Sequence, residues 1–284
     1  MKSDYSKNFI DHKFDKDVNR MYLNTLYSSL SSFLNISIEK IAEDYWDRKS
    51  NEDKAEQERV AGAKREEDVL EYYKKTQQYL YELVCEESVL KKQLLFEIIY
   101  RFCKKNKINR VLDFGGGIGG LCIYLANRKI SCEYIDVDGA ASRFARWRFE
   151  KEKLNIPLLY VSNLPSAKRY DLVVALEVLE HLFDIESTLN DINSCLKKNG
   201  YFINISTFLG GGVHLPQNEV YADIIKFNDL MSRRGFEFMG QLKQDRLSDF
   251  VRKSYFKNFL LNIRTIHRLK HGGNLLLFRD KKTS

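Results

Sequence analysis

Residues 111–120, VLDFGGGIGG, have a composition that suits the binding of a ligand by the main chain. Glycine tolerates positive φ and lets a ligand approach the backbone closely, and a helix that begins after such a turn offers free N–H groups. The spacing also fits G-x-G-x-x-G, so a nicotinamide dinucleotide enzyme is one alternative. Asp113 argues against it, because a carboxylate two residues before the first glycine would face the pyrophosphate. That carboxylate suits a ligand with an ammonium and a sulfonium group.

A second group of residues that can do chemistry is the sequence EVLEH, residues 177–181, which contains two carboxylates and an imidazole. It follows the apolar run YDLVVAL, and open α/β sheets bind ligands at the carboxyl ends of their strands. A further imidazole, His214, lies in the glycine-containing stretch STFLGGGVHLPQNE. Histidine titrates near neutral pH, so His181 or His214 is the best general base that the sequence offers, with Glu180 beside it.

The elements that position these groups follow from the hydrophobic pattern. Five short apolar runs between residues 108 and 206 alternate with amphipathic stretches, which predicts βα units and a parallel sheet. Two later runs, GFEFMGQLK and GNLLLFRD, complete an α/β fold with a seven-stranded mixed sheet and helices on both faces. The segment between them, residues 248–268, has a helical pattern. We expect a helical N-terminal cap over residues 1–88 and the sheet domain over residues 89–284.

Composition limits the class of protein. The chain has 284 residues, of which 44% are hydrophobic and 30% charged, and no apolar run reaches the roughly 20 residues of a membrane helix. Its five scattered cysteines predict a reduced, cytoplasmic setting rather than a disulfide framework. Residues 241–284 hold 11 Lys and Arg against 3 Asp and Glu. Such a basic end can steer an anionic partner, although a solvated basic helix explains it as well.

The order of the motifs resembles class I S-adenosylmethionine-dependent methyltransferases, which have a Rossmann-like fold. Asp113-x-Gly115-x-Gly117-x-Gly119 matches their first motif, and Asp136 in YIDVD lies where the family's acid binds the two ribose hydroxyls. A carboxylate suits that role because it accepts two hydrogen bonds at once. Asn163 stands where many members have an Asp that contacts the adenine amino group. The resemblance implies that S-adenosylmethionine is bound by Asp113, Gly115, Gly116, Gly117, Gly119, Asp136, Val137, Asn163, Leu164, Leu176 and Glu177.

The EVLEH motif resembles the ubiquinone-type O-methyltransferases of the methyltransferase type 11–12 group, and also the small-RNA 2′-O-methyltransferases. In the latter, two Glu and a His of this motif and a later His hold a divalent ion. That resemblance implies a metal site formed by Glu177, Glu180, His181 and His214, whose ligand types suit Mg²⁺, Mn²⁺ or Zn²⁺. On this interpretation His214 swings in when substrate orders its loop. The alternative is that EVLEH only packs and caps the corner between strand and helix.

The acceptor is the least defined part of the reaction. A small molecule methylated on oxygen is the first expectation, because a helical cap would roof a pocket and the chain has no recognisable nucleic-acid module. RNA is the alternative acceptor, and a non-catalytic S-adenosylmethionine-binding protein is the alternative from another class. Tyr72, Tyr73, Tyr79 and Tyr81 are expected in the core, with a lid as the other interpretation. The sequence indicates no membrane association and no particular oligomeric state.

Overall fold

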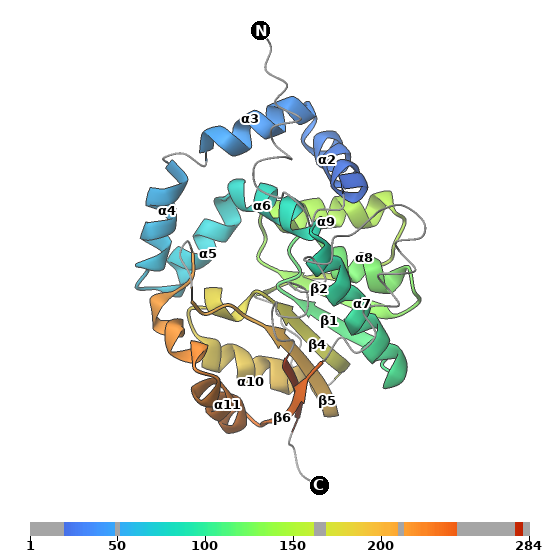
Figure 1. The fold of residues 1–284 in the computed structure, drawn as a ribbon, viewed down its shortest axis with the longest axis vertical. Coiled ribbons are helices and arrows are strands. Elements are labelled where there is room, and N and C mark those ends of the chain that lie inside the picture. The colour runs from blue at the N-terminus through green and yellow to red at the C-terminus, as the bar shows by residue number, and fades with distance from the viewer. Residues whose placement is uncertain (1–19, 49–51, 162–168, 210–212, 243–275, 281–284) are drawn as a thin grey trace, which may run out of the picture.

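The computed structural model describes residues 20–48, 52–161, 169–209, 213–242 and 276–280, and its centre is a seven-stranded sheet. The strand order is β3-β2-β1-β4-β5-β7-β6, and β7 is antiparallel to both of its neighbours. All seven expected strands and the mixed sheet are therefore confirmed (Figure 1). The strands are β1 (Arg110–Phe114), β2 (Ser131–Asp136), β3 (Leu158–Tyr160), β4 (Tyr170–Leu176), β5 (Leu196–Ile205), β6 (Phe236–Gln241) and β7 (Leu276–Asp280).

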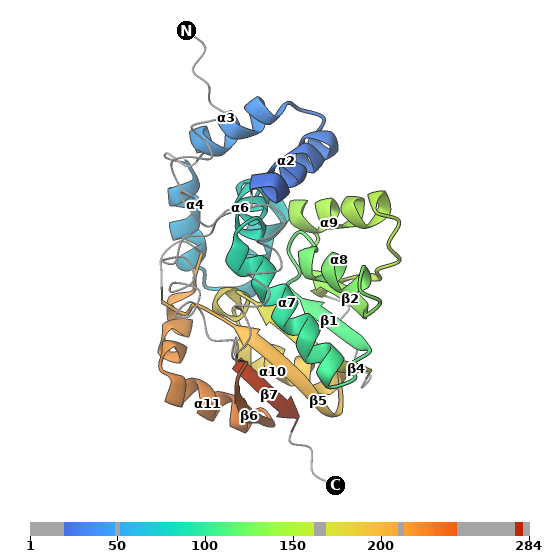
Figure 2. The ribbon, with the colours of Figure 1, turned by 45° about the vertical axis from the view of Figure 1, so that its right-hand side comes forward.

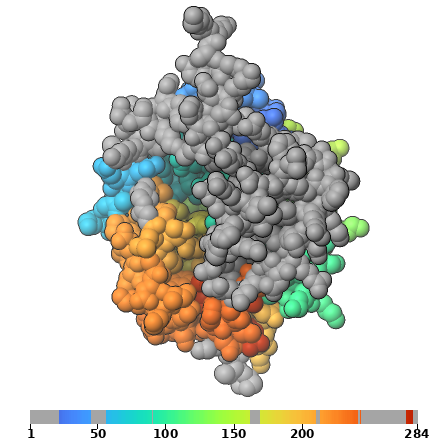
Figure 3. Space-filling view, in the orientation of Figure 1, coloured from blue at the N-terminus to red at the C-terminus, as the bar shows by residue number. Residues whose placement is uncertain are grey.

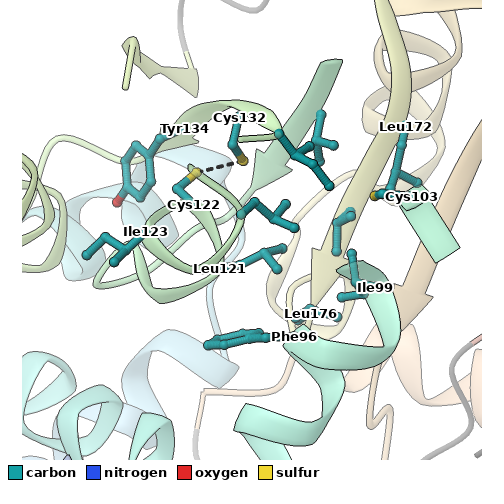
Figure 4. Close-up of a cluster of buried hydrophobic side chains, with 14 of the residues drawn as sticks. Phe96, Ile99, Cys103, Leu121, Cys122, Ile123, Cys132, Tyr134, Leu172 and Leu176 are labelled. Carbon is teal, nitrogen blue, oxygen red and sulfur yellow. Dashed lines mark hydrogen bonds between the residues drawn. The ribbon is translucent and has the colours of Figure 1, made fainter. Parts of the chain in front are cut away.

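Helices cover both faces of the sheet. One face packs against α7 (Leu90–Lys105), α8 (Gly120–Ala126) and α9 (Ala140–Lys151). The other packs against α10 (Ile185–Cys195) and α11 (Ile224–Arg233). Figure 4 shows part of the first core, where Phe96 and Ile99 of α7 lie near Leu121 of α8. The five cysteines are buried free thiols, and in this core Sγ of Cys122 and Cys132 are 2.9 Å apart.

The expected helical N-terminal region is confirmed for the described residues. It consists of α2 (Arg20–Leu34), α3 (Ile38–Arg48), α4 (Glu52–Ala61), α5 (Glu66–Lys75) and α6 (Gln78–Glu87). These helices lie at one end of the sheet (Figures 1 and 2), and residues of α4 and α6 share a cavity with the residues that follow β1 and β4. We call α2–α6 the cap. The domain boundary at residue 88 remains a prediction.

The cap shares cores with the rest of the protein. Side chains of α2, α3 and α6 pack with Ile118 and Phe144, and side chains of α4 and α5 pack with Val213 and Leu215. In the space-filling view the light-blue surface of the cap adjoins the orange surface of the segment after β5 (Figure 3). The cap therefore contacts both regions that the sequence marks as functional.

Two further observations concern the expectations above. The helix expected over residues 248–268 lies outside the described residues. None of the described helices has the length and apolar composition to cross a membrane.

Candidate active site

The glycine turn between β1 and α8 has a backbone that other residues would strain. Gly115, Gly117 and Gly119 have φ values of +69°, +56° and +79°. A Cβ on Gly116 would lie 2.5 Å from the Tyr134 ring, and one on Gly119 would lie 2.6 Å from the Phe149 ring. Left-handed φ and close contact both demand glycine here. The sequence interpretation of this turn as a backbone cradle is therefore consistent with the geometry.

A cavity of about 550 Å³ lies between this turn and the cap. Its sheet side includes the glycine turn, Asp113 and Leu176, and the acid–histidine motif contributes Glu177, Glu180 and His181. The cap contributes Tyr79, Glu82 and Leu83 among others, and Lys91 and Lys92 lie at the start of α7. The cavity is large enough for a cofactor and a small acceptor side by side.

Asp113 places a carboxyl group in the wall of this cavity. Its side chain is buried, and Oδ2 has no hydrogen-bond partner among the described residues. Burial raises the pKa of Asp113 to about 7, and the ammonium of Lys92 acts in the opposite direction. A cationic ligand would satisfy Oδ2 and stabilise the ionised form of this group. The residues present therefore fit the ammonium and sulfonium groups of S-adenosylmethionine.

Asp136 ends β2 beside the glycine turn. Its Oδ2 accepts the N–H of Gly117 at 2.7 Å, and Oδ1 accepts the N–H of Val137 at 2.6 Å. Burial raises the pKa of Asp136 to about 6, although both hydrogen bonds lower it. Asp136 and Val137 are not among the residues that line the cavity. Tyr79 of the cap is close enough for the Asp136 carboxylate to contribute to the raised pKa of its hydroxyl.

Two cofactor residues named from the sequence, Asn163 and Leu164, lie outside the described residues. Gly119 is part of the turn but does not line the cavity itself. The described residues of the expected cofactor set that do line it are Asp113, Gly115, Gly116, Gly117, Leu176 and Glu177.

The acid–histidine cluster is assembled from two segments distant in sequence. Glu180 and His181 belong to a short 3-10 helix, η2 (Leu179–His181), and His214 precedes η3 (Pro216–Ala222). One potential ligand atom from each of the three lies within 4.8 Å of the others, and the two imidazole rings are 4.9 Å apart, edge to face. Glu177, the fourth residue of the expected metal site, lies outside this group but lines the same cavity.

Hydrogen bonds hold the segment after β5 against η2. Glu180 Oε1 accepts the N–H of Thr207 at 2.9 Å, and the Glu180 carbonyl accepts the N–H of Leu215 at 3.1 Å. Nδ1 of His181 is 3.3 Å from the carbonyl oxygen of Val213. The expectation that His214 must swing in with substrate is therefore wrong for this structure. His214 is already in place, because the Leu215 N–H bonds to the Glu180 carbonyl and the Val213 carbonyl contacts the His181 ring, on either side of it.

The His181 contact also defines which ring nitrogen is available. A carbonyl oxygen only accepts, so Nδ1 carries the proton of this hydrogen bond and Nε2 keeps its lone pair. Burial lowers the pKa of His181 to about 4, and burial also lowers that of His214. Both imidazoles are therefore neutral at pH 7. A neutral imidazole can accept a proton or bind a metal ion.

The pKa values of Glu177 and Glu180 differ in the direction of their shifts. Burial and the neighbouring Glu177 raise the pKa of Glu180 to about 8. Burial also opposes ionisation of Glu177, but a hydrogen bond from Glu180 and the nearby Lys92 outweigh it and lower the Glu177 pKa. The pKa values of the two neighbouring carboxyl groups are therefore shifted in opposite directions, that of Glu177 downward and that of Glu180 upward.

The structure adds cap residues that the sequence did not assign to the site. Tyr73 has a buried hydroxyl with no partner among the described residues, and its ring centre is 6.0 Å from that of His181. Tyr79 lines the cavity, whereas Tyr72 and Tyr81 are core residues as expected. Helical spacing could not separate the two pairs, because the four rings come from two short helices with different partners.

Comparison with known proteins identifies the class. Residues 88–240, more than half of the chain, match the model of a family described as a methyltransferase domain. The chain belongs to this family and carries an S-adenosylmethionine-dependent methyltransferase domain, which favours this class over a nicotinamide dinucleotide enzyme.

Curated relatives include ubiquinone biosynthesis O-methyltransferases. Those of Rhodopseudomonas palustris and Bradyrhizobium diazoefficiens are 30% and 33% identical over 98 residues, which are 33% of this chain and 38% of each relative. The chain thus matches less than half of the length of these relatives. Among solved structures, a putative sarcosine dimethylglycine methyltransferase from Galdieria sulphuraria has a TM-score of 0.48 at 14% identity, over 70% of this chain and 89% of its own.

Proposed function

We propose that this protein transfers the methyl group of S-adenosylmethionine to an oxygen atom of a small-molecule acceptor. The observation that carries the proposal is one roofed cavity in which the glycine turn and Asp113 face a neutral imidazole pair, His181 and His214. The cofactor supplies a methyl group already activated by a positive sulfur. The protein aligns the acceptor oxygen, excludes water and removes a proton.

The cavity's construction supports a small acceptor. Its cap side closes over the sheet edge through the core that joins α4 and α5 to Val213 and Leu215. A roof over part of the cavity limits the size of the acceptor. Five buried free thiols suit a reduced, cytoplasmic setting for this reaction.

Titration calorimetry with S-adenosylmethionine is the direct test, with NADH as the rival ligand. Binding of NADH alone would refute the proposal. S-adenosylhomocysteine formation with a panel of hydroxylated metabolites would then identify the acceptor. Failure to form it with any acceptor, RNA included, would favour the non-catalytic binding protein instead.

The ribose site is tested by Asp136→Ala. We expect a loss of about 1–3 kcal/mol in cofactor affinity, because hydrogen bonds to a charged group contribute on this scale. Asp138→Ala is the matched control, since this carboxylate is two residues away and its side chain is 56% exposed. Equal affinity of the Asp136 variant and the unaltered protein, measured by calorimetry, would place the ribose elsewhere.

The acid–histidine cluster supports a divalent metal as part of the same proposal. Glu180, His181 and His214 bring one carboxylate and two imidazoles together, a donor set that suits Mn²⁺ or Zn²⁺ and, through the carboxylate, Mg²⁺. Glu177 lines the same cavity and would contribute its charge from outside this group. A bound cation would lower the pKa of an acceptor hydroxyl.

Chelator treatment tests the metal. We expect activity to fall on dialysis against EDTA and to return with Mg²⁺, Mn²⁺ or Zn²⁺. Independently of activity, the unaltered protein should retain stoichiometric metal by elemental analysis and His214→Ala should retain less. Full activity in the chelator would refute a catalytic role for a metal and leave His181 or His214 as a simple base.

RNA is the second candidate acceptor, favoured by the same metal-ligating cluster and by the basic residues 241–284. Binding to single-stranded RNA should then weaken steeply with salt, because phosphate contacts release counterions. Absent or salt-independent binding would favour the small molecule.

A further inference from the structure

A buried network links the cap to the glycine turn. Tyr22 of α2 donates its hydroxyl to Glu87 Oε1 at 2.6 Å, and Nη2 of Arg148 on α9 donates to the same oxygen at 2.9 Å. Nη1 of Arg148 donates to the carbonyl of Ile118 at 2.7 Å. The Glu87 and Arg148 side chains are each only 5% exposed. Three segments distant in sequence thus meet at one carboxylate.

This network contacts the glycine turn at two points. Ile118 belongs to the turn, and a Cβ on Gly120 would lie 2.2 Å from Glu87 Oε2. Glu87 also lines the cavity. A buried ion pair is a weak source of stability, because desolvation of the two charges offsets their attraction. The position of Glu87 at the wall of the cavity favours a role for this pair in ligand binding instead.

The charges at this wall match the amino-acid end of the cofactor. Glu87 and Asp113 provide two carboxylates, and Lys92, which acts on Asp113 and Glu177, provides an ammonium. Glu87 Oε2 receives one long hydrogen bond, 3.3 Å from Nη1 of Arg148, and so has a lone pair for a further donor. The ammonium of an α-amino acid is such a donor, and its carboxylate is a partner for the Lys92 ammonium.

We propose that Glu87, oriented by Tyr22 and Arg148, binds the ammonium group of the cofactor's amino-acid end. Tyr22 and Arg148 are positioning residues. Tyr22 does not line the cavity, so α2 contributes to the cofactor site only by orienting Glu87. Arg148 also fixes the turn through Ile118. The inference rests on the proposed cofactor and goes beyond it, since it assigns a cofactor-binding role to the cap.

The test uses two ligands that differ in the amino-acid end. S-adenosylhomocysteine carries it, and 5′-methylthioadenosine lacks it but keeps the nucleoside and thioether. Calorimetry on the full chain should show that Glu87→Gln lowers the affinity for S-adenosylhomocysteine by ~10-fold or more. This is the scale of a hydrogen bond to a charged group. Its affinity for 5′-methylthioadenosine should not change. Tyr22→Phe should give a smaller loss with the same ligand selectivity.

The chain offers a matched control. Tyr170 donates its hydroxyl at 2.9 Å to Glu133, a buried carboxylate that also pairs with Arg110 and Arg169. None of these residues lines the cavity. Tyr170→Phe removes the same kind of bond as Tyr22→Phe and should leave the affinity for both ligands unchanged.

The outcomes distinguish failure of the proposed function from failure of the Glu87 assignment. If the unaltered protein binds neither ligand, the proposed function fails, and this inference fails with it. If it binds both but Glu87→Gln and Tyr22→Phe weaken both equally, the network is only structural and the inference alone is refuted. Thermal unfolding of each variant confirms that the measured protein is folded. Tyr22→Phe decides the question if Glu87→Gln does not fold.

Discussion

Replacement of His181 by glutamine is expected to lower kcat by about 10²- to 10⁴-fold, the range for loss of a general base. The affinity for S-adenosylhomocysteine should not change, because the cofactor is assigned to the glycine turn and the wall formed by Asp113 and Glu87. The reason for the large effect is geometric. Nδ1 of His181 is engaged with the Val213 carbonyl, so Nε2 is free to accept a proton in a cavity that is also lined by His214. Initial rates and calorimetry on the same preparation measure the two quantities.

Two companion variants decide how His181 acts. If a metal ion is bound, His214→Gln and Glu180→Gln should lower kcat to a similar extent, because each residue offers one of the three clustered ligand atoms. If His181 is a simple base, the other two variants should retain most of the activity. Unchanged kcat in His181→Gln would contradict both interpretations and move proton removal to another group.

Most of the fold could be predicted because its signals are local. Runs such as YDLVVAL are apolar at nearly every position, since a central strand such as β4 is buried on both faces. Glycines 115, 117 and 119 are required by their own φ values, so a short stretch of sequence identifies the turn. The position of β7 between β5 and β6 has no such local signal, because it depends on how distant segments pair.

The site could be predicted only where its residues are close in sequence. EVLEH presents its groups together, but the position of His214 depends on contacts of η2 with main-chain atoms of the segment after β5. Main-chain atoms are common to all residues, so the sequence of that segment does not reveal these contacts. The sequence also contains no signal for the network of Glu87, Tyr22 and Arg148, because its members are distant in sequence. Glu87 lies 65 residues from Tyr22 and 61 from Arg148. In the sequence each of the three is an ordinary helical residue.

Loss of the Arg148 guanidinium should cause one of the largest single losses of stability in this protein. Arg148→Met leaves the Glu87 carboxylate buried with only Tyr22 as a donor and leaves the Ile118 carbonyl without its partner. Removal of one member of a buried pair costs about 3–5 kcal/mol, because an uncompensated charge remains in the interior. Urea unfolding measures this as a lower free energy of unfolding.

Two further variants test that explanation. Arg110→Met should cost clearly less, because Arg110 is 41% exposed and its partner Glu133 retains Arg169 and Tyr170. The double variant Glu87→Gln with Arg148→Met should recover most of the loss, since it leaves no buried charge unpaired. A double variant no more stable than Arg148→Met alone would show that the guanidinium acts through packing or through Ile118. Recovered stability together with lost S-adenosylhomocysteine binding would separate the two effects, because the ion pair would then be dispensable for folding and required for the cofactor.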